Sequence, residues 1–198
     1  MKRSALLLAA LLLMVCAASA QNFEAAVNAY ASFTNKSSQN LADRTATTSG
    51  GGFLTLGHSG VRNGFQINLG YTRNSQTFNS PSGAVVGPIA TNVYQYTADW
   101  IVHTNYKSIR PFAFLGGGVL SFSPTGAAIK ATPIPISRQN RPALLYGGGA
   151  DFRLAKELAL RAQFRGLIYQ APDYGNDSLH TGSAMFTFEP SLGLVYRF

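Results

Sequence analysis

Cysteine is nearly absent from this 198-residue chain, which contains only Cys16. Because Cys16 lies in an N-terminal segment that we expect to be removed, the mature chain is predicted to fold without disulfides and without thiol chemistry. Charged residues are also scarce, at 12%, about half the share of ordinary soluble domains. So little charge argues against intrinsic disorder.

Long apolar runs are missing after residue 20. A membrane-spanning helix needs about 20 consecutive apolar residues, so the pattern excludes a helical membrane protein. The net charge is +8; without Lys2 and Arg3, 14 basic and 8 acidic residues remain, which gives +6. These basic residues are scattered, whereas nucleic-acid binding needs a clustered basic face. We therefore expect no nucleic-acid partner.

The N-terminus has the three parts of a secretory signal peptide. Lys2 and Arg3 are followed by an apolar segment over residues 5–18, and Ala18-Ser19-Ala20 fits an A-x-A cleavage site. We therefore predict a signal peptide over 1–20, cleaved by recognition of Ala18 and Ala20, and a single folded domain over 21–198.

The rest of the chain alternates between apolar and polar residues with a period of two, which is the signal of β-strands with two different faces. Phe65, Ile67 and Leu69, for example, alternate with Gln66 and Asn68. Eight such runs lie near 22–34, 50–58, 64–74, 93–104, 111–122, 143–154, 158–170 and 183–198. Most are longer than the usual soluble strand of about 5–6 residues and match the 9–11 residues of a tilted membrane strand.

The predicted connections alternate in length. Long connections are expected at 35–49, 75–92, 123–142 and 171–182, and short ones at 59–63, 105–110 and 155–157. Short periplasmic turns and long external loops are typical of outer-membrane barrels. The prediction is an all-β fold: an eight-stranded antiparallel up-and-down transmembrane β-barrel with both ends in the periplasm.

Charge and aromatic residues indicate which face meets lipid. Charged strand residues fall mostly on one face, predicted to be a polar, packed lumen whose candidate ion network is Glu24, Asp99, Asp151, Arg153, Arg161, Arg165, Glu189 and Arg197. Aromatic residues near strand ends suggest interfacial girdles, namely Phe23, Tyr71, Trp100, Phe112, Phe152, Phe188, Tyr196 and Phe198. The competing soluble barrel would reverse the two faces.

Two hairpins allow a register to be predicted. A two-residue turn at Asn63-Gly64 would place Leu56 opposite Tyr71, with Leu54 and Leu56 outside. A turn at 155–157 would place Asp151 opposite Arg161, Gly149 opposite Gln163 and Gly147 opposite Arg165. Here the glycines would leave room for the long side chains. Glu24 and Arg197 would meet where the barrel closes. The ion pairs are interpreted as neutralising the lumen, with a salt-bridge gate as the alternative.

These motifs resemble the family of small eight-stranded outer-membrane β-barrels that includes the OmpA membrane domain and OmpX. The similar stretches are residues 111–118, 146–152 and the alternating C-terminal residues Phe188, Leu192, Leu194, Tyr196 and Phe198. In that family the last strand is the signal read by the barrel-assembly machinery, so the resemblance implies this partner during insertion. It also implies the outer membrane of a Gram-negative-type bacterium, with outer-membrane lipid and lipopolysaccharide as surroundings.

The sequence gives little support for a catalytic site or a metal site. His58, His103 and His180 are not at metal-ligand spacing, so no metal or cofactor is expected. A lipid-modifying enzyme would need a Ser–His pair. His58-Ser59 are adjacent in a strand and point to opposite faces, which leaves His180 with Ser183 as a weak alternative. The triple glycines are not phosphate loops, because no Lys-Ser/Thr follows them.

The sequence therefore predicts a monomeric, non-enzymatic outer-membrane protein with a structural or surface-interaction role through four long external loops. The third loop, with Lys130, Arg138 and Arg141 beside isoleucines and prolines, is a candidate contact for lipopolysaccharide or an unidentified extracellular ligand; a stiffened loop is the plainer interpretation. The first alternative function is a narrow, low-conductance pore.

Overall fold

The computed structural model describes residues 22–35, 37–39, 42–79, 85–131, 135–175 and 183–198. The predicted signal peptide therefore lies outside the described residues. Ten strands and a short helix form the described part: β1 (Phe23–Thr34), β2 (Ser37–Gln39), β3 (Ala42–Ala46), β4 (Ser49–Ser59), β5 (Asn63–Asn79), β6 (Val85–His103), β7 (Ile109–Pro124), α2 (Gly126–Ala131), β8 (Gln139–Arg153), β9 (Leu158–Gln170) and β10 (Ala184–Arg197). No described helix is long and apolar enough to cross a membrane.

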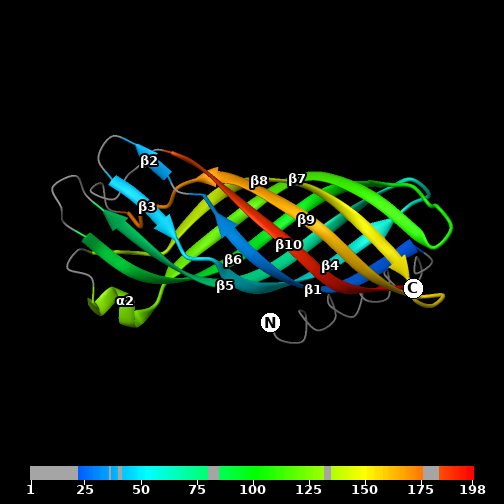
Figure 1. Cartoon of the computed structure of the whole chain (residues 1–198), viewed down its shortest axis with the longest axis horizontal. Helices are drawn as coiled ribbons and strands as arrows, with labels where there is room; N and C mark the ends of the chain where they lie inside the picture. Colours follow the sequence, from blue (N-terminus) through cyan, green and yellow to red (C-terminus); the bar gives the residue numbers. More distant parts are fainter. Residues whose placement is uncertain (1–21, 36, 40–41, 80–84, 132–134, 176–182) are drawn as a thin grey trace, which may run out of the picture.

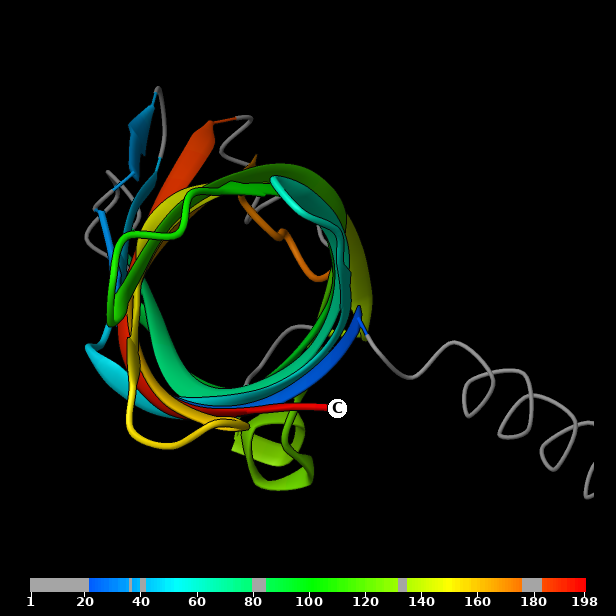
Figure 2. The ribbon, with the colours of Figure 1, turned by 90° about the vertical axis from the view of Figure 1, so that its right-hand side faces the viewer.

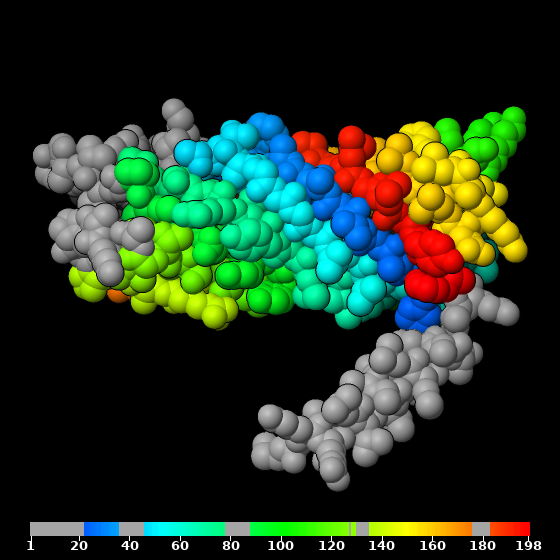
Figure 3. Space-filling view, turned by 90° about the horizontal axis from the view of Figure 1, so that it is seen from below, coloured from blue at the N-terminus to red at the C-terminus, as the bar shows by residue number. Residues whose placement is uncertain are grey.

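Eight of the strands close into an antiparallel barrel, as predicted. Each of these strands pairs with its sequence neighbour, and β1 pairs with β10 to complete the ring. Figure 2 shows the closed ring along the barrel axis, and Figure 3 shows β1 (blue) beside β10 (red) on the surface. The remaining two strands extend the sheet outside the ring: β3 pairs with the last residues of β5, and β2 pairs with β3.

The connections separate into two ends of the barrel (Figure 1). At one end lie the turns 60–62, 104–108 and 154–157, together with the first residues of β1 and the last residues of β10; we call it the short-turn end. The other end, the loop end, carries β2, β3, α2 and the connection after β9. The prediction of a loop over 75–92 was wrong. β5 and β6 continue as a ladder there, with Ser75 opposite Ala90 and Gln76 opposite Ile89.

The two register predictions had different outcomes. The β8–β9 pairing is the predicted one, with Asp151 opposite Arg161 and Gly149 opposite Gln163. The β4–β5 pairing is shifted, since Leu56 lies opposite Ile67 and not Tyr71. The chain reverses over Gly60–Arg62, where the Gly60 N–H donates to the Asn63 carbonyl at 2.7 Å, so Asn63-Gly64 already belongs to β5. Leu54 and Leu56 nevertheless face outward, as expected.

The outer wall between the two ends is apolar and almost uncharged. Large exposed side chains cover it, among them Leu54, Leu56, Ile67, Leu69, Leu115, Leu160, Leu192 and Leu194. Of the predicted girdle residues, Trp100, Phe152 and Tyr196 are exposed toward the short-turn end and Tyr71 and Phe188 toward the loop end. Phe112 is a correction: it is 7% exposed and points into the lumen. Its even-numbered neighbours on β7, Arg110 and Phe114, also point inward.

The polarity of the two faces reverses toward the loop end, a region that we call the head. Outward positions become polar, as at Arg73, Asn92, Asn140 and Gln170. Inward positions combine polar residues, such as Gln76 and Thr91, with apolar ones. The apolar ones and residues of the connections belong to a buried cluster that continues down the lumen to Ile101, Phe112 and Phe114 and includes Ile89, Val93, Leu120, Phe122, Leu145, Leu167, Tyr169, Ile136, Tyr174 and Met185. The expectation of a polar lumen thus fails in the head. There the outer wall mixes polar residues with exposed apolar ones such as Leu144, and apolar side chains pack on the inner face.

The head core can be tested with two adjacent leucines. Leu145 is fully buried, whereas Leu144 is 49% exposed on the outer wall. We expect Leu145→Ala to lower the free energy of unfolding by about 2–5 kcal/mol, because it leaves a cavity. Leu144→Ala should have a much smaller effect. Urea unfolding of the folded protein in detergent micelles measures both, and equal effects would contradict a packed core in the head.

Candidate functional site

The charged residues in the lumen near the short-turn end form one connected cluster. Arg161 lies at its centre and is 1% exposed. Its Nε donates to Asp151 Oδ1 at 2.7 Å and its Nη2 to Glu24 Oε1 at 2.9 Å. Arg197 contacts Asp151 through Nη2, and its Nε lies 3.6 Å from Glu24 Oε2. Two carboxylates from β1 and β8 are thus shared by arginines from β9 and β10.

Arg110 is a member of this cluster that sequence reasoning missed. Its Nη1 lies 3.3 Å from Glu24 Oε2, and its side chain is 12% exposed. In the sequence, Arg110 was expected in a turn and Phe112 on the lipid face. The inward direction of the even-numbered residues of this strand was therefore not predicted. Gln66 also belongs to the cluster, donating to Glu24 Oε1 at 2.6 Å.

A second group occupies the middle of the lumen. Arg165 Nε lies 3.8 Å from Glu189 Oε2, and both side chains are almost fully buried. Gln95 connects them, because its Nε2 donates to Glu189 Oε1 at 2.6 Å and its Oε1 accepts from Arg165 at 3.3 Å. Arg165 also lies over the Phe53 ring, 4.1 Å from the centroid, a cation–π contact.

Asp99 lies between these groups and takes part in no ion pair among the described residues. Asn68 donates to its Oδ2 at 2.7 Å and in turn accepts from Thr55 at 2.7 Å. Arg153 also forms no ion pair within the described part of the chain, and its side chain is exposed at the short-turn end. The structure therefore connects six of the eight predicted network residues by ion pairs and leaves Asp99 and Arg153 outside them.

The glycines of β8 and β7 make space for lumen side chains at two positions. A Cβ on Gly147 would lie 2.5 Å from the Phe114 ring, so this glycine accommodates Phe114 and not, as predicted, Arg165. A Cβ on Gly116 would lie 2.7 Å from the Asp99 Cβ. In both cases a larger residue would displace a lumen side chain.

The connection after β9 fills the head end of the lumen. Tyr174, which is fully buried, bonds through its hydroxyl to Gln76 and to Thr91, the latter at 2.9 Å. Its N–H donates to Gln139 at 3.0 Å. Figure 2 shows this segment, in orange, inside the ring. The lumen is therefore occupied by side chains at the short-turn end, in the middle and in the head.

The predicted surface contacts differ in their availability. Arg141 is held by Asp173 at 2.9 Å and donates to Gln170 at 3.1 Å. Arg138 donates to Ser121 at 2.8 Å but remains exposed. Lys130 belongs to α2, and its side chain lies outside the described part.

The residues considered for catalysis do not converge. His58 faces outward and packs edge-on against Phe23, with ring centroids 5.2 Å apart, whereas Ser59 borders the lumen. His180 lies outside the described residues, so its distance to Ser183 is not defined. Among the described residues, no group of three or more His, Cys, Asp or Glu could hold a metal ion.

The C-terminal residues of the predicted assembly signal all lie on the outer wall. Phe188, Leu192, Leu194 and Tyr196 alternate along β10, and Phe198 follows it with its N–H donating to the Phe23 carbonyl at 2.9 Å. Their recognition by the assembly machinery stays a prediction.

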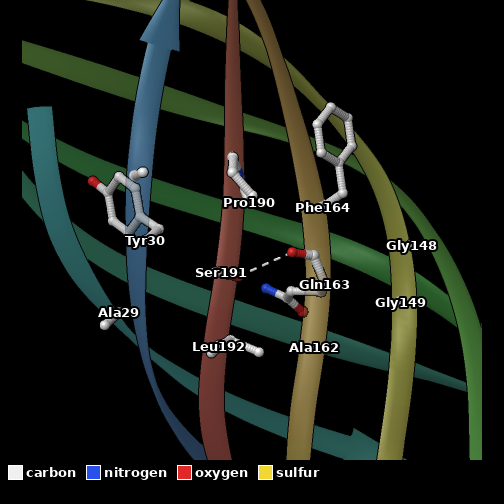
Figure 4. A pocket seen from close by; sticks show the side chains of 11 residues that line it. Ala29, Tyr30, Gly148, Gly149, Ala162, Gln163, Phe164, Pro190, Ser191 and Leu192 are labelled. Atoms are coloured by element: carbon white, nitrogen blue, oxygen red, sulfur yellow. Dashed lines mark hydrogen bonds between the residues drawn. The ribbon is translucent and has the colours of Figure 1, made fainter. Parts of the chain in front are cut away.

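A hollow lies on this outer wall, over β1, β8, β9 and β10 (Figure 4). Its volume is about 800 Å³, and small residues such as Ala29, Ala31 and Ala162 leave it shallow. Pro190, which has no N–H, lies where the β1–β10 pairing is interrupted between Tyr30–Ser191 and Phe33–Phe188. The lining of the hollow is mostly apolar.

A closed barrel of long strands, with an apolar outer wall and a charged lumen, is the architecture of a transmembrane β-barrel of the outer membrane. The chain belongs to the family described as outer membrane protein beta-barrel domain, which matches residues 6–198. It is thus an outer-membrane β-barrel protein. The rule that short turns face the periplasm predicts that the short-turn end is the periplasmic end.

Solved structures show the same fold at low identity. Neisserial surface protein A is 14% identical, with a TM-score of 0.62 over 89% of this chain and 97% of that one. OprG from Pseudomonas aeruginosa is 11% identical, with a TM-score of 0.59 over 89% and 96%. The attachment invasion locus protein Ail of Yersinia pestis is 17% identical, with a TM-score of 0.52 over 90% and 99%. No curated protein sequence matches this one.

The role of the central arginine can be tested by removing it. We expect Arg161→Ala to lower the free energy of unfolding by about 3–5 kcal/mol, because Glu24 and Asp151 are left buried without their main partner. Arg153→Ala is the control, since Arg153 is exposed and forms no ion pair within the described residues. Urea titration in micelles measures both, and a wild-type stability for Arg161→Ala would rule out this arrangement.

Proposed function

We propose that this protein is an outer-membrane anchor that presents a rigid head for contact with other surfaces, and that its barrel is not a pore. The observation that carries the proposal is the filling of the lumen. Arg161, Arg165, Glu189 and Tyr174, spaced along the barrel, are all less than 2% exposed. Their bonds run across the lumen between different strands, so no single side chain can move aside without losing partners.

The structure of the head supports the proposal that it presents a rigid contact surface. β5 and β6 have 17 and 19 residues, whereas about 9–11 suffice to cross the bilayer. The additional residues carry the sheet beyond the apolar wall, where it has its own buried core. A projecting, internally packed sheet is suited to hold a contact surface in one shape, which lowers the entropy lost on binding.

The partner favoured by the chemistry of the head is an anionic saccharide or lipid surface, such as lipopolysaccharide. Lys130 and Arg138 lie in the connection between β7 and β8, which also exposes Ile129. Arg141 is already neutralised by Asp173, so it contributes less to the attraction of an anionic partner than its charge suggests. The contact is therefore assigned to the connection around α2 and not to the whole loop end.

The pore alternative is tested by electrical recording. We expect purified protein in planar bilayers to give no discrete conductance steps, because each level of the lumen is filled. Tyr174→Ala should remain silent as well, since the arginine groups below it stay in place. Reproducible single-channel openings of the unmodified protein would refute the sealed lumen and favour the low-conductance pore.

The surface contact is tested with immobilised lipopolysaccharide and the protein in nanodiscs. We expect Lys130→Gln combined with Arg138→Gln to weaken binding about threefold or more, with an effect that fades at high salt, because charge attraction at a surface is modest and screened by salt. Lys107→Gln combined with Lys156→Gln removes equal charge from the periplasmic turns and is the control. Equal losses in both variants, or no binding by the unmodified protein, would contradict the proposal.

A further inference from the structure

A polar hollow opens at the periplasmic end of the lumen, and we call it the periplasmic mouth. It has a volume of about 330 Å³ and lies beside the first residues of β1 and the last residues of β10. The side chains that matter for its chemistry are Glu24, Ser59, His103, Arg110, Arg153 and Arg197. Their elements, β1, β4, β6, β7, β8 and β10, surround the barrel axis, so the mouth is built by distant parts of the chain.

Residues that line the mouth contain buried hydrogen-bonding atoms for which no hydrogen bond is found among the described residues. They are the Nε atom of Arg110, the Nε atom of Arg197, which lies 3.6 Å from Glu24 Oε2, Oγ of Ser59 and both ring nitrogens of His103. His103 is only 7% exposed, and although the Gly60 backbone lies beside it, neither ring nitrogen forms a hydrogen bond of normal geometry. Buried polar atoms are normally bonded, so a group of them around one hollow points to a missing ligand.

The charge balance indicates the sign of that ligand. Arg110, Arg153, Arg161 and Arg197 surround this end of the lumen, whereas the carboxylates among them are Glu24, Asp151 and the α-carboxylate of Phe198, which also lines the hollow. The next carboxylate, Asp99, lies deeper and accepts a hydrogen bond from Asn68. The mouth therefore has more guanidinium than carboxylate groups.

Glu24 does not block an anion, although it borders the mouth. Its Oε1 accepts from Arg161 and Gln66, and its Oε2 lies 3.3 Å from Arg110 and 3.6 Å from Arg197. Both oxygens are thus occupied from the protein side. Arg110 and Arg197 keep further N–H groups beside the hollow, and the guanidinium of Arg153, which forms no ion pair with any described residue, lies at its rim.

We propose that the periplasmic mouth binds an oxyanion of the phosphate class, held by Arg110, Arg153 and Arg197, with Ser59 and His103 as additional partners. Guanidinium groups present paired donors that match phosphate oxygens, and several of them favour a multiply charged anion. Such a phosphate is carried either by the headgroup of a phospholipid or by a free ion in the periplasm.

The experiment is calorimetric titration of the folded protein with inorganic phosphate, in a phosphate-free non-ionic detergent at low ionic strength. We expect saturable binding of one phosphate per chain. Arg153→Gln should weaken it at least tenfold, because Arg153 has no other ion-pair partner within the described residues and its loss leaves the fold intact. Lys156→Gln removes the same charge from the adjacent turn, where the side chain is exposed outside the mouth, and should leave binding unchanged.

Three readouts decide the outcome. A boiling-dependent shift in gel mobility establishes that each variant is folded. Absence of saturable phosphate binding by the unmodified protein, or equal weakening by Arg153→Gln and Lys156→Gln, overturns the proposal.

Native mass spectrometry from nanodiscs containing phosphatidylglycerol then separates the two sources. Lipid retained by the unmodified protein and lost in Arg153→Gln supports a headgroup site. Phosphate binding that depends on Arg153 without retained lipid supports a site for the free ion.

Discussion

The constraint on which the rest of this structure depends is the pairing of every backbone N–H and C=O inside hydrocarbon. Strands can meet it only by closing into a ring, and here β1 and β10 close it. With eight strands the enclosed space is about as wide as two layers of side chains. Any charge placed inside must find its counter-charge within that space, which explains why Arg161 contacts two carboxylates from two other strands.

The same strands serve two environments in succession. Between the girdles the outward face is apolar and the inward face polar. In the head the assignment reverses, so Leu145 and Leu167 are core residues although Arg165 on the same face of β9 is part of a charged group. This change explains how a barrel can be filled by ion pairs at one end and by a hydrophobic core at the other.

The filled lumen and the polar periplasmic mouth are the bases of two separate proposals. A small barrel fold is shared by proteins with different roles, so the fold alone does not select one. The proposals rest on particular residues: Tyr174 and Arg165 for the closed lumen, Arg138 and its neighbours for the outer surface, and Arg153 with Arg110 for an anion. The outward and periplasmic ends can therefore be altered independently.

Period-two alternation in the sequence determined the all-β class, the eight membrane strands and the outward direction of Leu54 and Leu56, because lipid imposes a strict apolar face. It also determined the Asp151–Arg161 pairing, since the three-residue connection at 155–157 leaves few registers. It could not locate strand residues outside the bilayer, where no apolar face is required, and the 75–92 region was therefore mistaken for a loop. Only the tertiary structure decided that Phe112 points inward, that Arg110 joins Glu24 and that Tyr174 enters the head. These placements depend on which side chains fit together across the lumen, and residues far apart in the chain contribute to each.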